Sequence, residues 1–164
     1  MLFRSFLAAL AARPGVRVYG DTNPERAPRT ATVAFNVEGF DHALVAAILN
    51  DYFCVAVRNA CFCAHPYVRD MLKPELWAME IDPEDAGALA EVEARKGMVR
   101  ASFGLYTVQD DLDALLAGID AMVADPGSFR ARYCPDGHGG WRHVSFRADA
   151  DRKSTRLNPV TLES

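Results

Sequence analysis

The sequence lacks the features that mark several large classes of protein. No apolar run approaches the roughly 20 residues of a membrane-spanning helix, and a net charge of -4 disfavours sequence-independent binding to nucleic acid. Only 4 cysteines occur in 164 residues, and their spacing forms no disulfide framework. We therefore expect one cytoplasmic globular domain with reduced thiols that binds neither membrane nor nucleic acid.

Hydrophobic periodicity predicts mixed helices and strands. Helical spacing predicts helices over residues 2–12, 41–52, 66–72, 82–96 and 107–125. Alternating apolar residues predict strands over residues 16–19, 30–37, 53–58 and 98–104. The first segment also has the charge and short apolar run of a signal peptide, but its helical spacing favours an amphipathic helix packed on a core.

The order of these elements predicts the architecture. Strands mix with helices, but too few βαβ units exist for a doubly wound sheet, so we expect an α/β domain built as an α+β-like two-layer sandwich. Asp41 is the expected N-cap of the second helix, and Thr107-x-x-Asp110 resembles a capping box. The domain should cover residues 1–126, followed by an irregular extension over 127–150 and a disordered tail over 151–164.

A cluster of reactive residues follows the strand predicted over residues 53–58. If the strand continued, Cys61, Cys63 and His65 would share one face, where thiolates and imidazole are zinc ligands. This spacing matches the usual zinc patterns poorly, because no second ligand pair exists. Cys61 or Cys63 is instead interpreted as a small buried side chain, or as a thiolate nucleophile beside Arg58. Because Cys54 falls inside the predicted strand, we expect Cys63 to be alkylated more readily than Cys54.

Arg100 is the second candidate. Val99, Ala101 and Phe103 alternate toward the core, so Arg100 and Ser102 point to the opposite face of the sheet. Arg100 is either a solvated arginine or a bidentate clamp for a carboxylate, because a planar guanidinium binds carboxylates better than lysine does. His138 and His143 lie among glycines without periodicity, and we interpret them as surface residues.

Three segments in order, residues 29–37, 58–66 and 97–106, resemble the C-terminal small domain of class V aminotransferase-like enzymes. This group of pyridoxal phosphate (PLP) enzymes of fold-type I includes the cysteine desulfurases, and the resemblance extends over residues 2–125. It implies that Arg100 holds the α-carboxylate of an amino-acid substrate and that Arg58 is a second active-site arginine. Cys63 matches the cysteine that accepts sulfur as a persulfide, although the usual G-H-H-C-A-x-P pattern is replaced by the sequence of residues 60–66.

The resemblance also implies components that this sequence does not provide. Enzymes of this group hold PLP as a Schiff base on a lysine, and none of Lys73, Lys96 and Lys153 has a matching sequence context. We therefore expect the cofactor lysine in a large domain preceding residue 1, a homodimeric full-length enzyme, and no activity of this chain alone. The competing hypothesis is a non-enzymatic domain that binds a metal or a partner chain through Cys61, Cys63 and His65.

Overall fold

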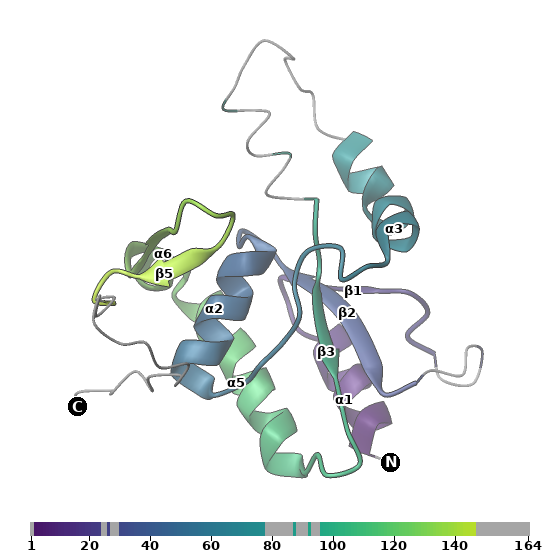
Figure 1. Cartoon of the computed structure of the whole chain (residues 1–164). Coiled ribbons are helices and arrows are strands. Elements are labelled where there is room, and N and C mark those ends of the chain that lie inside the picture. Colours follow the sequence, from purple (N-terminus) through teal and green to yellow (C-terminus); the bar gives the residue numbers. More distant parts are fainter. Residues whose placement is uncertain are drawn as a thin grey trace.

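The computed structural model describes residues 2–23, 26, 30–77, 87, 92 and 96–146. Its N-terminal half contains α1 (Leu2–Ala11), β1 (Val16–Tyr19), β2 (Thr32–Val37), α2 (His42–Phe53) and α3 (His65–Trp77). Its C-terminal half contains β3 (Val99–Ser102), α5 (Gln109–Ala124), α6 (Pro126–Ala131), β4 (Tyr133–Pro135) and β5 (Trp141–His143). Figure 1 shows this arrangement. No helix in these ranges has both the length and the apolar content needed to cross a membrane.

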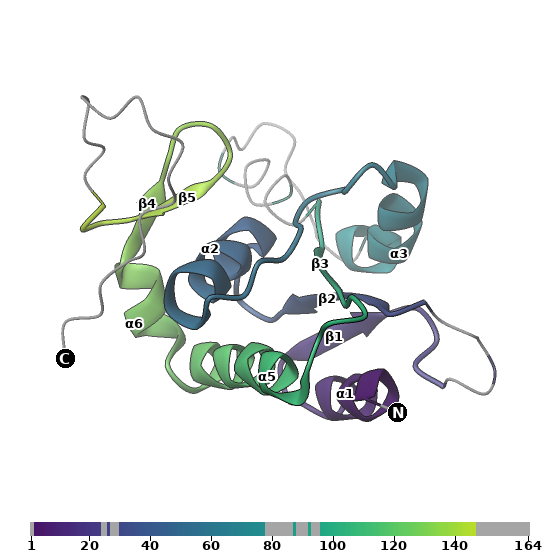
Figure 2. The same cartoon turned by 60° about the horizontal axis from the view of Figure 1, so that its bottom comes forward.

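A three-stranded antiparallel sheet organises the described residues, in the order β1-β2-β3. The β2–β3 register pairs Val33 with Ala101, Ala34 with Arg100, and Phe35 with Val99. One face of the sheet packs on α1, α2 and α5 to form the main core, while α3 lies on the opposite side (Figure 2). The two-layer core expected from the sequence is confirmed, and α3 adds a smaller apolar cluster on the second face.

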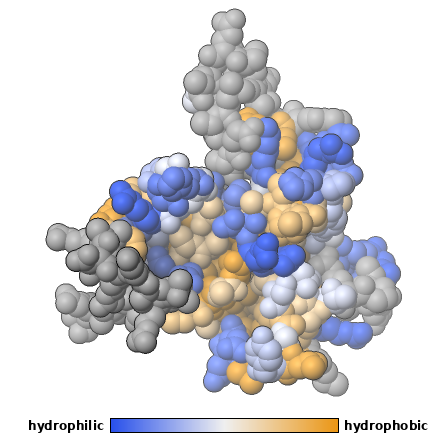
Figure 3. All heavy atoms as spheres, in the orientation of Figure 1, coloured by the Kyte–Doolittle hydropathy of each residue, from blue (hydrophilic) through white to orange (hydrophobic). Residues whose placement is uncertain are grey.

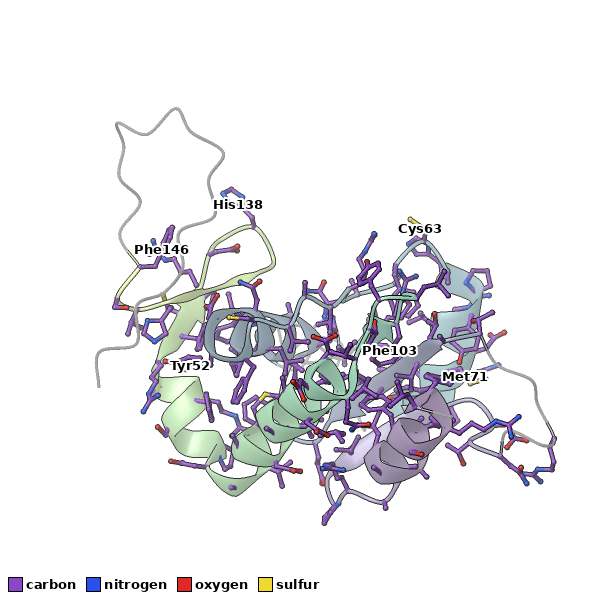
Figure 4. The ribbon with its side chains drawn as sticks, turned by 90° about the horizontal axis from the view of Figure 1, so that it is seen from below. Tyr52, Cys63, Met71, Phe103, His138 and Phe146 are labelled. Carbon is purple, nitrogen blue, oxygen red and sulfur yellow. The ribbon has the colours of Figure 1, made fainter. Side chains whose placement is uncertain are left out.

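The alternation predicted for the central strands is confirmed by burial. Val33, Phe35 and Val37 of β2 are each at most 2% exposed, because they face the helices. Phe103, just after β3, packs its ring against Phe6 of α1 at a centroid distance of 4.9 Å. Phe103, labelled in Figure 4, is partly buried against the main core. The core face of the sheet was therefore readable from a period of two residues.

Helix α2 begins and ends at residues with specific backbone roles. The Asp41 carboxylate accepts hydrogen bonds from the N–H groups of Ala43 and Leu44 at 2.6 and 3.1 Å, as expected of an N-cap. Its last residue is Phe53, and Cys54 caps it with a left-handed φ of 55°. The strand predicted over residues 53–58 is therefore wrong, and so is the expected shielding of Cys54, whose side chain is exposed.

Extended chain follows Cys54, but among the described residues it pairs with the sheet in one isolated β-bridge. Arg58 and Arg100 exchange two backbone hydrogen bonds, of 3.0 and 2.7 Å, in an isolated antiparallel bridge. The alternation of side chains persists without a strand, since Val55 and Val57 pack partly against the main core while Arg58 is exposed.

Two other predictions need correction. The cap of α5 lies one residue later than expected: the Val108 N–H donates to Asp111 at 2.9 Å, while the Thr107 hydroxyl accepts from Gly104. The extension over 127–150 is not irregular, because α6 and the β4–β5 hairpin occupy residues 126–143. The predicted helix over 82–96 and the tail over 151–164 lie outside the continuously described residues.

The β4–β5 hairpin packs on α2 through polar and aromatic contacts. The Tyr52 hydroxyl lies 2.7 Å from His143 Nε2, and the Tyr133 hydroxyl donates to Asp51 at 2.9 Å. Burial, aided by the Asp51 carboxylate, raises the pKa of Tyr133 above its usual value. His143 is thus a half-buried packing residue rather than the surface residue predicted, whereas His138 is exposed at the tip of the hairpin (Figure 4).

Candidate functional site

A hollow of about 370 Å³ opens on the face of the sheet that lies opposite the main core. Strands β1, β2 and β3, the turn before α3 and the first turn of α3 all contribute to its wall. The lining residues are Tyr19, Thr30, Thr32, Ala34, Phe62, Tyr67 and Arg100. Figure 3 shows hydrophilic side chains next to hydrophobic ones below α3, on the side of the molecule seen in Figure 1. The hollow therefore combines aromatic rings and hydroxyls with one guanidinium.

Arg100 is the cation of this hollow. It occupies the middle of β3 opposite Ala34, and strand alternation directs its side chain away from the main core, as predicted. Its Nε atom is buried and has no hydrogen-bond partner, and no acceptor among the described residues bonds the guanidinium. Buried polar atoms are almost always paired, so an unpaired Nε is an exception that a hydrogen-bond acceptor from outside the described residues would remove.

Arg58 lies next to Arg100 through the backbone bridge, but its side chain does not line the hollow. The two residues stand directly opposite each other, which places their side chains on the same side of the sheet. Arg58 is exposed, whereas Arg100 is half-buried. The structure therefore brings the two predicted arginines together at the edge of β3 and leaves only Arg100 in the wall of the hollow.

Cys63 lies in a tight turn between Arg58 and α3. The Cys61 carbonyl accepts a hydrogen bond from the Ala64 N–H at 2.7 Å, and φ is positive at Ala60, Phe62 and Cys63. The side chain of Cys63 is exposed, and its sulfur points away from the ribbon in Figure 4. This geometry presents the thiol to a reagent that approaches from outside the described chain.

The metal site proposed from the sequence is not supported by this turn. Because the chain reverses at residues 61–64, Cys61, Cys63 and His65 do not continue along one face of a strand. Cys61 is half-buried, with its Sγ 3.7 Å from the Lys96 carbonyl oxygen, and His65 is exposed at the start of α3. Across the described ranges, no group of three or more histidine, cysteine or carboxylate side chains is placed to hold a metal ion.

Most of the hollow was not predicted from the sequence. Thr32 and Ala34 share the face of Arg100 through the period-two alternation, so those neighbours could have been identified. Tyr19 requires the pairing of β1 with β2, and Tyr67 requires α3 to fold back over the sheet. The sequence gives one indication for Phe62, because this residue lies between Cys61 and Cys63 in the motif of residues 58–66.

Comparison with known proteins identifies the family. A family model described as "Aminotransferase class-V" matches residues 2–115. The chain belongs to the class-V aminotransferase family. This match confirms the resemblance found in the three sequence segments, together with the expected fold class. Members of this family are PLP-dependent in general.

Relatives of this class-V aminotransferase chain include cysteine desulfurases. It is 30% identical over 119 residues to a cysteine desulfurase of Dickeya dadantii strain 3937, covering 73% of this chain and 22% of that protein. It is 32% identical over 105 residues to a probable cysteine desulfurase of Halobacterium salinarum, and the match covers 64% of this chain and 19% of that protein. The crystal structure of the cysteine desulfurase CsdA from Escherichia coli matches with a TM-score of 0.47 and 26% identity. This match covers 75% of this chain and 25% of the CsdA chain. The chain spans about a fifth of the length of these curated relatives.

The described residues do not fit covalent attachment of PLP. No lysine lines the hollow, and the two lysines in the described part of the chain, Lys73 and Lys96, have exposed side chains elsewhere. The hollow offers a guanidinium and hydroxyls, which suit an anionic ligand, but no amine for a Schiff base.

Proposed function

We propose that this chain forms the carboxylate-binding wall of the active site in a PLP-dependent enzyme of the cysteine desulfurase type, acting on an amino acid. The observation that carries the proposal is Arg100, whose guanidinium enters the hollow with a buried, unpaired Nε and no acidic partner among the described residues. PLP supplies the stabilisation of a carbanion at the amino acid's α-carbon, and a second, lysine-bearing polypeptide region provides that cofactor.

The physical argument favours a carboxylate as the ligand of Arg100. A guanidinium donates two parallel hydrogen bonds to a carboxylate, and such charge-assisted bonds are about twice as strong as neutral ones. The backbone of Arg100 is fixed by its pairing with Ala34 on one side and with Arg58 on the other. The clamp is therefore anchored on a strand bonded on both edges, which limits the reorganisation needed when a ligand binds.

We assign Cys63 the role of sulfur acceptor when the amino acid is cysteine, with Arg58 as a second cation beside the same site. The Cys63 thiolate would attack the substrate sulfur, so that an S–S bond forms while the substrate Cβ–S bond breaks. The electron pair of that bond would pass to Cβ, which takes up a proton to give alanine. Exposure of the thiol in a turn and the names of the relatives support this assignment. The proposal also includes that the complete enzyme is a cytoplasmic homodimer. Incubation of the complete enzyme with L-cysteine should leave a persulfide on Cys63 that mass spectrometry detects, and its absence during sulfide production would exclude this role.

Arg100 variants test the proposed clamp. With the PLP-bearing region supplied, Arg100→Ala should lower kcat/KM for the amino acid by tens- to thousands-fold, which corresponds to about 2–5 kcal/mol of lost binding. Arg100→Lys should recover only part of this loss, because lysine keeps the charge but not the fork. Arg142→Ala, which removes an exposed arginine from β5, is the matched control and should leave kcat/KM unchanged. Unchanged kinetics in Arg100→Ala would contradict the proposal.

A further inference from the structure

Phe62 and Arg100 form a cation–π pair, called the stack below, at the wall of the hollow. The Arg100 Cζ atom lies 5.1 Å from the centroid of the Phe62 ring, within the range of a cation–π interaction. Both residues line the hollow, although 37 residues separate them in the sequence. The ring therefore covers the guanidinium inside the region where a ligand would enter.

The Phe62 ring contacts the Arg100 guanidinium through a cation–π interaction. This guanidinium makes no hydrogen bond to the described residues, so the planar group is held by its aliphatic stem and by the Phe62 ring. A long arginine side chain loses substantial rotamer entropy when a ligand fixes it. A ring across one face reduces this cost in advance, and it leaves the N–H edges of the guanidinium for a planar acceptor.

Phe62 is itself held in an uncommon conformation. Its φ is 33°, in the left-handed region that residues with side chains rarely adopt. The turn is fixed at both ends, because the Ala60 carbonyl accepts from the Met98 N–H at 3.1 Å and the Cys61 carbonyl accepts from the Ala64 N–H. Strained residues of this kind persist where the surroundings determine them, and they concentrate at functional sites.

We propose that Phe62 is a positioning residue, which holds the Arg100 guanidinium in the orientation that binds a carboxylate. This inference rests on the proposed function, since it assumes that Arg100 is the carboxylate ligand. Phe62 makes no bond to the substrate in this role. Its contribution is to restrict Arg100 before binding, so its removal weakens carboxylate affinity without removing the charge.

The chain offers a matched control for this stack. Phe40 lies under Arg130 at the same distance, with Cζ 5.1 Å from the ring centroid, and both phenylalanines are half-buried. The Phe40 pair does not line the hollow. Phe40→Leu therefore removes an equivalent arginine–aromatic stack elsewhere, and Phe62→Tyr is the conservative variant that keeps the ring.

The experiment follows the Arg100 Nε–Hε signal by NMR in the full ¹⁵N-labelled chain, with L-alanine as the carboxylate probe. The signal is assigned from its disappearance in Arg100→Lys. Phe62→Leu should raise the Kd for L-alanine by about three- to tenfold, the equivalent of one exposed cation–π contact or slightly more. It should also speed exchange of the Hε proton with water. Phe62→Tyr should retain the wild-type Kd, and Phe40→Leu should leave the Arg100 signal unchanged.

The possible failures are distinguishable. If L-alanine shifts the Arg100 signal with the same Kd in wild type and in Phe62→Leu, the positioning role is wrong while the carboxylate site stands. If L-alanine does not shift the wild-type Arg100 signal at saturating millimolar concentrations, the carboxylate site fails and the inference fails with it. Circular dichroism confirms that each variant folds, and Phe62→Met replaces Phe62→Leu if the latter does not.

Discussion

His42 is a half-buried titratable residue outside the hollow. It is the first residue of α2, and its ring lies so close to Gly97 that a side chain at position 97 would collide with it. Its Nδ1 atom is buried and has no hydrogen-bond partner within the described chain. Burial lowers the pKa of His42 below the usual value for histidine, and the neighbouring Asp41 carboxylate offsets part of this effect. The fold therefore favours the neutral imidazole.

A pH-dependent stability follows from that preference. Because the folded pKa lies below the unfolded value of about 6.5, the unfolded chain binds more protons between the two values, and stability rises with pH in this window. The contribution of His42 is fully present above about pH 6.5 and is lost as the pH falls below it. We expect urea unfolding between about pH 7.5 and pH 5 to show a smaller acid destabilisation in His42→Gln than in wild type.

His138→Gln is the control for this measurement, because His138 is an exposed histidine on the hairpin loop. It should keep the wild-type dependence of unfolding free energy on pH. An identical acid destabilisation in wild type and His42→Gln would show that burial of His42 does not contribute to the pH dependence.

At the scale of elements, Gly118 determines how closely α5 approaches α2. A Cβ atom at this position would lie 2.6 Å from Leu49 Cδ2 and 3.0 Å from the Phe53 ring. Leu49 is fully buried in the main core, so its side chain can move only if its core neighbours also move. Gly118→Ala should therefore destabilise the fold, since overpacking costs about 1–3 kcal/mol and outweighs the roughly 1 kcal/mol that alanine gains over glycine in a helix.

Gly127→Ala provides the matched control for the helix-packing prediction. Gly127 lies in α6, where the nearest atom to an added Cβ is 4.0 Å away. The substitution should be neutral or stabilise by up to about 1 kcal/mol, because only helix propensity changes. Urea denaturation of both variants compares the two effects, and a Gly118→Ala protein as stable as wild type would mean that the two helices can separate at no cost.

The best-supported sequence predictions were those for elements with several turns or alternations. Helix α5 keeps apolar residues on one stripe over 16 residues, and β2 alternates over six, so each period is unambiguous. The strand expected at 53–58 failed because extended chain and strand give the same alternation, and only neighbouring hydrogen bonds separate them. The three-residue strands β4 and β5 are too short for any period to be detected.

Only part of the candidate site could be predicted from the sequence. Alternation placed Arg100 on the face away from the core, and the motif around residue 63 marked the turn. The hollow itself depends on tertiary folding, because it needs β1 beside β2 and α3 above the sheet. The Phe62–Arg100 stack joins two segments that have no local sequence relationship, so neither periodicity nor spacing could indicate it.

At the scale of the whole molecule, the C-terminal extension shares the core of the preceding elements. Tyr133 is 5% exposed within the main core cluster, and Phe129 and Trp141 pack against it. The indole Nε1 of Trp141 lies 3.3 Å from the Asp41 carboxylate, which also caps α2. These contacts place residues 126–143 in the same packed unit as the sheet, although the sequence suggested a boundary at residue 126.

Shared packing predicts a single cooperative unfolding transition. In a Trp77→Phe background, Trp141 fluorescence reports the hairpin while far-UV circular dichroism reports the helices, and both urea transitions should have the same midpoint. His143→Ala, which removes the hydrogen bond to Tyr52, should lower both midpoints together by an amount equivalent to about 1–2 kcal/mol. A fluorescence transition at lower urea than the dichroism transition, or a His143→Ala effect confined to fluorescence, would instead make the extension a separate unit that begins near residue 126.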